Sequence, residues 1–107
     1  MAWIYLFLAG LSEVGWPVGL KLAQQSAART TGIIMAVGFM AVSGFFLWLA
    51  QREIPIGTSY AVWTGIGAAG TFFVGVHFYG DCVNAGRYLG VALIIAGIAT
   101  LKLSHSQ

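Results

Sequence analysis

Residues 1–20, MAWIYLFLAGLSEVGWPVGL, decide the fold of this chain. The stretch is apolar almost throughout and carries one charged residue, Glu13, a little past its middle. About 20 predominantly apolar residues are enough for a helix to span the hydrocarbon core of a bilayer. A charged side chain near the centre of such a span costs about 2.5–3.5 kcal/mol and usually marks a path for ions or substrate. Glu13 is therefore the first candidate functional residue.

The composition extends this interpretation to the whole chain. Of its 107 residues, 59% are hydrophobic and 7% are charged, whereas soluble domains carry about 25% charged residues. We therefore expect an all-α integral membrane protein with one domain over residues 1–107. The net charge of +2 forms no basic patch, so we expect no nucleic-acid partner. The single cysteine forms no metal-ligand pattern, and we expect neither a metal nor a cofactor.

Four segments are long and apolar enough to cross the membrane. They predict helices over residues 2–20, 32–50, 56–79 and 85–103. Pro55 suits the start of the third helix, because proline lacks the N–H that the first helical turn leaves unpaired. Residues 80–84, GDCVN, predict a helix stop, a turn and a new N-cap.

The charges at the two ends of the predicted bundle are nearly balanced. Four spans place both termini on one side, with Arg52 and Lys102, while Lys21, Arg29 and Arg87 lie on the other. Since the excess of Lys and Arg sets orientation, either one weak charge fixes a single topology or the chain inserts both ways. Dual insertion supplies antiparallel partners, and so the inverted repeat that many transporters use.

The fourth predicted helix carries a face of small residues. Gly86, Gly90 and Gly97 share that face, and the first two form a small-x-x-x-small pair. These glycines fit either a dimer contact or packing within one subunit. Gly15 and Gly19 on the first helix give a weaker version of the same pattern.

On the first helix, Glu13 shares a face with Trp16 and Pro17. Pro17 removes the backbone hydrogen bond that the Glu13 carbonyl would accept. This predicts a kink or a hydrated carbonyl beside the carboxylate, unless the proline is incidental.

On the third helix, Tyr60, Trp63, Thr64 and Gly67 form a second stripe, which fits either core or lipid-facing packing as well as a site. Ser43 is a lone hydroxyl on the second helix, and such a serine usually bonds its own i−4 carbonyl.

Together these groups suit a cation. A carboxylate supplies charge, hydroxyl and indole N–H groups orient a ligand, and aromatic faces attract positive charge. A carboxyl group that holds a proton cannot also pair with a cation, so two copies of Glu13 could exchange the two. Since the sequence contains no catalytic dyad or phosphate loop, we expect a transporter and not an enzyme.

Two motifs strongly resemble the small multidrug resistance family: residues 10–16, GLSEVGW, and residues 55–67, PIGTSYAVWTGIG. Length and the four-helix layout agree, so the resemblance covers essentially the whole chain. It implies an antiparallel, dual-topology homodimer in the bacterial inner membrane. It also implies exchange of cations for protons at the Glu13 residues of both subunits.

Within the family, Glu13 with Trp16, Ser43 and residues 63–67 resemble the guanidinium-exporter branch. That resemblance implies that Ser43 hydrogen-bonds the glutamate and that the glycine-rich fourth helix dimerises. The implied pocket residues are Glu13, Trp16, Ser43, Tyr60 and Trp63, and Pro17, Gly65 and Gly67 are candidates for a conformational or kink role. Two alternatives stay open: an exporter of hydrophobic quaternary ammonium cations, and one subunit of a paired heterodimer.

Some residues depart from the usual pattern of that branch, including Pro17 and the end of the third helix. We expect His77 to be interfacial, Asp81 to be a loop or cap residue, and Cys82 to have no role.

Overall fold

The computed structural model describes residues 1–104, and its regular elements there are all helical. In chain order these elements are α1 (Ala2–Leu22), the short 3₁₀ turn η1 (Ser26–Ala28), α2 (Arg29–Ala50), α3 (Ile56–Phe78) and α4 (Ala85–Ser104). Each α-helix is long and apolar enough to cross a membrane. The predicted class, an all-α protein with four membrane-spanning helices, is confirmed, and only the last three residues of the predicted domain lie outside the described residues.

The helix ends differ most from the expected ones between α1 and α2. Helix α1 extends two residues further, to Leu22, and α2 starts at Arg29, three residues early. The Ala23 carbonyl accepts a hydrogen bond from Arg29 Nε at 3.4 Å, across the short connection. Hydropathy reports which residues suit the hydrocarbon core, so it misses the polar turns that continue a helix into the interface.

The α3–α4 connection has the predicted stop, turn and cap. Gly80 adopts a φ of +66°, which favours glycine at a helix C-terminus. The Asp81 N–H then donates back to the Gly75 carbonyl at 3.1 Å. Asn84 Oδ1 accepts the Arg87 N–H at 2.9 Å, as an N-cap does.

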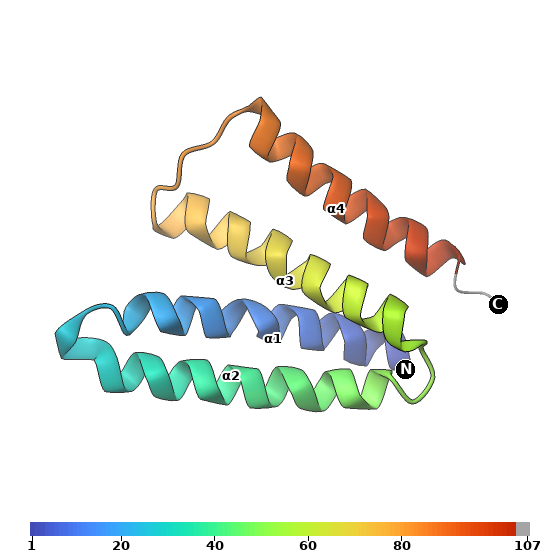
Figure 1. The fold of residues 1–107 in the computed structure, drawn as a ribbon, viewed down its shortest axis with the longest axis horizontal. Coiled ribbons are helices and arrows are strands. Elements are labelled where there is room, and N and C mark those ends of the chain that lie inside the picture. The colour runs from blue at the N-terminus through green and yellow to red at the C-terminus, as the bar shows by residue number, and fades with distance from the viewer. Residues whose placement is uncertain (105–107) are drawn as a thin grey trace.

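The four helices lie in one layer, in the order α2, α1, α3, α4 (Figure 1). The layer measures 50 × 34 × 17 Å, and a single helix with its side chains is about 10–12 Å across. The start of α1 and the end of α4 lie at the same end of the layer (Figure 1). One chain is therefore an open sheet of helices whose two broad faces are uncovered.

Glycines bring α1 and α2 into the closest contact in the layer. A Cβ on Gly19 would lie 2.7 Å from the Ala36 nitrogen and 2.8 Å from the Gly32 oxygen. A Cβ on Gly32 would lie 2.5 Å from backbone atoms of Gly19 and Ala23. Close backbone approach at small residues is the usual way that membrane helices associate. Gly19 is therefore used within the subunit.

We predict that Gly19→Ala destabilises the chain by about 1–3 kcal/mol, because the added methyl meets backbone atoms that cannot move aside. The matched control is Gly38→Ala, since a Cβ at Gly38 has no neighbour within 4 Å. Unfolding in mixed detergent micelles, followed by circular dichroism, measures both. Equal stability of the two variants would contradict this account of the α1–α2 contact.

Candidate functional site

Glu13 lies on α1 directly against Gly67 of α3. A Cβ on Gly67 would collide with the Glu13 side chain at Cγ. Glycine at this position therefore creates the space in which the glutamate side chain lies. The acid is half-buried between the two helices.

The Glu13 side chain faces a groove of about 410 Å³. Its lining residues are Glu13, Pro17, Thr64, Gly67, Ala68, Thr71, Phe72 and Asp81. Among residues 1–104, no hydrogen-bond donor and no basic side chain pairs with the Glu13 carboxylate. Inside a membrane an unpaired carboxylate is costly, so Glu13 is the least compensated charge of the groove.

A hydrogen-bonded chain joins three helices beside this turn of α1. Trp63 Nε1 donates to Ser43 Oγ at 2.7 Å, and Ser43 Oγ donates to the Ala9 carbonyl at 2.7 Å. Ser43 is fully buried. The Ala9 carbonyl is the acceptor for the Glu13 N–H in a regular helix. The series of hydrogen bonds therefore ends on the turn of α1 that carries the glutamate.

The partner of Ser43 differs from both sequence-based expectations. Lone serines in membrane helices usually bond their own helix, but this hydroxyl crosses to α1. The family resemblance implied a bond to the Glu13 side chain, whereas here the acceptor is the Ala9 carbonyl one turn earlier. Thr64 follows the usual pattern, since its hydroxyl bonds the Tyr60 carbonyl at 2.8 Å.

Four of the expected pocket residues divide into two groups. In the first group, Tyr60 and Trp63 meet edge to face, with ring centroids 5.3 Å apart, and Trp63 is hydrogen-bonded to Ser43. Glu13 lies instead in the groove lined by Thr64 and neighbours further along α3. Trp63 and Thr64 are adjacent on α3, so this helix connects the two groups.

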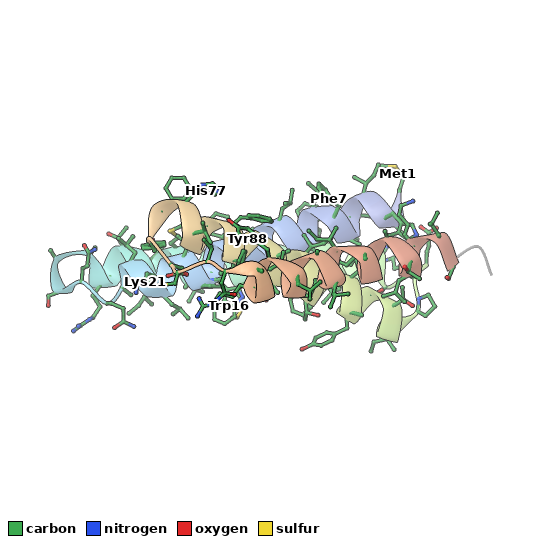
Figure 2. The ribbon with its side chains drawn as sticks, turned by 90° about the horizontal axis from the view of Figure 1, so that it is seen from above. Met1, Phe7, Trp16, Lys21, His77 and Tyr88 are labelled. Atoms are coloured by element: carbon green, nitrogen blue, oxygen red, sulfur yellow. The ribbon has the colours of Figure 1, made fainter. Side chains whose placement is uncertain are left out.

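Trp16 is half-buried, and its Nε1 is shielded from solvent without a hydrogen-bond partner among the described residues. Its side chain projects to one face of the layer, and His77 projects to the opposite one (Figure 2). His77 and Cys82 are exposed, and neither lines the groove that contains Glu13.

The residues expected to bend helices lie within helices that continue past them, and each lies beside another helix or the groove. Helix α1 continues through Pro17, which lines the groove one turn beyond Glu13. Helix α3 continues through Gly65 and Gly67. A Cβ on Gly65 would lie 2.9 Å from Ile98 of α4, so Gly65 admits an α4 side chain.

Helix α4 packs against α3 and leaves most of its surface open. No atom lies within 4 Å of a Cβ built on Gly90 or Gly97, and one on Gly86 meets only the Asn84 side chain, at 3.3 Å. Gly97 lines a groove between α3 and α4, and close packing within the subunit does not require glycine at these three positions.

The amino-acid sequence matches the family model described as Small Multidrug Resistance protein over residues 1–94. The chain belongs to the small multidrug resistance family. With four helices that can span a bilayer, this small multidrug resistance protein is a multi-pass membrane protein.

Curated relatives cover almost the whole chain. A protein of Yersinia pseudotuberculosis serotype I (strain IP32953), named guanidinium exporter, is 48% identical over 104 residues, which are 97% of this chain and 99% of the relative. A protein of the same name from Citrobacter freundii is 46% identical, with 97% and 98% covered. One from Proteus vulgaris is 45% identical, with 97% and 99% covered.

Sequence reasoning missed two polar residues of the groove of this small multidrug resistance protein, Thr71 and Asp81. Thr71 continues the α3 stripe, seven residues after Thr64, so helical periodicity could have found it. Asp81 reaches the groove only because the chain turns back at Gly80, which periodicity does not reveal.

We predict that Ser43→Ala and Trp63→Phe are energetically coupled by about 0.6–1.7 kcal/mol, the range for interhelical hydrogen bonds in membranes. A double-mutant cycle on unfolding free energy in micelles measures the coupling. Thr100→Ala, paired with Trp63→Phe, is the control, because the Thr100 hydroxyl bonds its own helix at Ala96. A coupling near zero for Ser43 and Trp63 would refute the bond.

Proposed function

We propose that this protein is a proton-coupled antiporter that exports guanidinium and related small guanidinyl cations across the bacterial inner membrane. Protons and substrate compete for the Glu13 carboxylates of two subunits. The chain carries no cofactor in this mechanism, since charge exchange at the carboxylates is sufficient.

Relatives named guanidinium exporter, 45–48% identical over nearly the full length, support the choice of substrate. Their coverage is as high on their side as on this one, so the likeness includes every helix. The chemistry of the groove agrees with that substrate class.

The observation that carries the proposal is the unpaired Glu13 carboxylate in a membrane-embedded groove. A guanidinium group is planar and presents parallel N–H donors that match the two carboxylate oxygens. The hydroxyls of Thr64 and Thr71 line the same groove and offer further acceptors. A quaternary ammonium ion has no N–H to donate, so it cannot form these hydrogen bonds.

Competition at one carboxylate couples the two fluxes. A proton arriving at Glu13 removes the charge that holds the cation, and an arriving cation displaces the proton. An unpaired charge is costly inside a bilayer. The empty and deprotonated state is therefore disfavoured while the site switches its opening from one side of the membrane to the other. Exchange therefore proceeds with one or the other bound.

A second copy completes the transporter in this proposal. One chain is an open layer, so a partner is needed to cover the face with the glutamate and to close an aqueous site. An antiparallel partner supplies the second Glu13 and the inverted repeat on which alternating access depends. The proposed dimer contact is the exposed surface of α4 around Gly90 and Gly97, where an added Cβ would meet no neighbour within 4 Å.

We predict that Glu13→Gln abolishes guanidinium binding and guanidinium-driven proton movement, while the protein still inserts and dimerises. Glutamine keeps the shape of the side chain but can neither carry charge nor exchange a proton. Proteoliposome transport with a pH-sensitive dye, together with size-exclusion chromatography, measures these properties. Retained proton-coupled transport by Glu13→Gln would eliminate the mechanism.

We predict that an imposed proton gradient drives guanidinium uptake at least about tenfold faster than uptake of a hydrophobic quaternary ammonium ion of equal charge. Trp63→Gly should narrow that ratio, since it opens space beside Ser43 and removes the indole N–H. Radiolabelled uptake into proteoliposomes measures both ions. The reverse preference in the wild type would favour the multidrug alternative.

We predict that Gly90→Leu weakens dimerisation at least about tenfold, which corresponds to 1.4 kcal/mol, without unfolding the helices. The control is Gly38→Leu, which adds equal bulk on α2, at the opposite edge of the layer (Figure 1). Fluorescence energy transfer between labelled copies in liposomes measures dimerisation. A wild-type chain that stays monomeric would instead indicate a heterodimer with a homologous subunit.

A further inference from the structure

Two neighbouring grooves lie along α1 and α3, and together they are called the track. The groove at Glu13 and a smaller one of about 190 Å³ share three lining residues, Pro17, Thr71 and Asp81. The smaller groove adds Lys21 and neighbouring residues at the ends of both helices. From Glu13 to Lys21 the helix rises about 12 Å, so the track leads from the middle of the span to the membrane surface.

The Asp81 side chain is folded back into this track. Gly80, with its φ of +66°, reverses the chain, and the Asp81 N–H donates to the Gly75 carbonyl at 3.1 Å. The carboxylate then lies on Gly75, where a Cβ would collide with Asp81 Oδ2. Gly80 and Gly75 are thus both needed for the Asp81 side chain to point along α3.

The basic side chains around Asp81 have other partners. Lys21 Nζ lies over the Tyr79 ring, 5.8 Å from its centroid. Arg87 Nη1 donates to the Cys82 carbonyl at 2.8 Å. Within residues 1–104, no basic nitrogen forms an ion pair with Asp81. The Asp81 carboxylate therefore forms no ion pair in the track, while Lys21 lines the same outer groove and contacts the Tyr79 ring instead.

Other groups that line the two grooves also suit a cation. The face of the Tyr79 ring already attracts one ammonium group, as aromatic faces do. Thr71 lines both grooves, and its hydroxyl can accept a hydrogen bond from a passing N–H group. Beyond it, Thr64 lines the groove at Glu13 itself.

We propose that Asp81 is an outer binding position that captures a guanidinium-type cation at the membrane surface and delivers it along the track to Glu13. This inference rests on the proposed function and adds a second residue that determines how fast substrate is captured. In an antiparallel pair one Asp81 lies at each membrane surface. Asp81 concentrates substrate and takes no part in proton exchange.

The test is guanidinium transport by proteoliposomes of the full chain, measured as KM and kcat separately, with Asp81→Asn as the main variant. Asp81→Asn keeps the size of the side chain and removes its charge. We expect its KM to rise about tenfold, at the lower end of the range by which charged clefts speed capture. The kcat and the number of protons exchanged for each guanidinium should match the wild type.

Three further measurements separate capture from a structural role. Asp81→Glu should restore the KM, because it returns the charge. Gly75→Ala should raise the KM like Asp81→Asn, since its methyl displaces the Asp81 carboxylate, while Gly38→Ala should leave it unchanged. At 1 M salt, where the screening length falls to about 3 Å, the wild type and Asp81→Asn should converge.

An unchanged KM in Asp81→Asn, with active wild type, overturns the outer position and leaves the proposed function intact. A fall in kcat, or a loss of proton coupling as in Glu13→Gln, also overturns it, because Asp81 would then belong to the exchange site itself. Wild-type vesicles that carry no guanidinium overturn both proposals together.

Discussion

The contact between Glu13 and Gly67 is the constraint on which the rest of the structure depends. The glutamate side chain occupies the space that a missing Cβ leaves on α3, and its carboxylate has no partner within residues 1–104. Protein interiors normally pair such a group with an opposite charge. In the proposed mechanism a proton or a cation pairs with Glu13 instead. The grooves lined by the surrounding residues extend toward the end of the helices.

Small residues determine where the chain packs against itself and where it does not. Gly19 and Gly32 bring α1 and α2 together, and Gly65 receives Ile98 of α4. By contrast, a Cβ added at Gly90 or Gly97 would meet no neighbour within 4 Å. Gly19, Gly32 and Gly65 therefore build the layer from α1, α2 and α3, while the α4 glycines make no such close contact. An open layer with exposed α4 glycines agrees with the proposal that two copies form the site.

Hydropathy was sufficient to predict the four helices, with ends within three residues of the observed ones, because the membrane imposes length and apolarity on each span. It also identified Glu13, since a charge is conspicuous against that background. The Ser43 acceptor could not be predicted, because it depends on how α2 is rotated against α1. The same holds for Asp81, whose direction depends on a backbone reversal at Gly80.

The central claim is that one carboxylate pair binds either protons or the cation. Proton release on guanidinium binding tests it most directly: a pH-sensitive dye follows guanidinium added to purified protein in weak buffer, across a series of starting pH values. The account predicts release of protons in step with binding, an apparent Kd that rises as the pH falls, and no release from Glu13→Gln. Guanidinium binding without proton release, and with the same Kd at every pH, would contradict it.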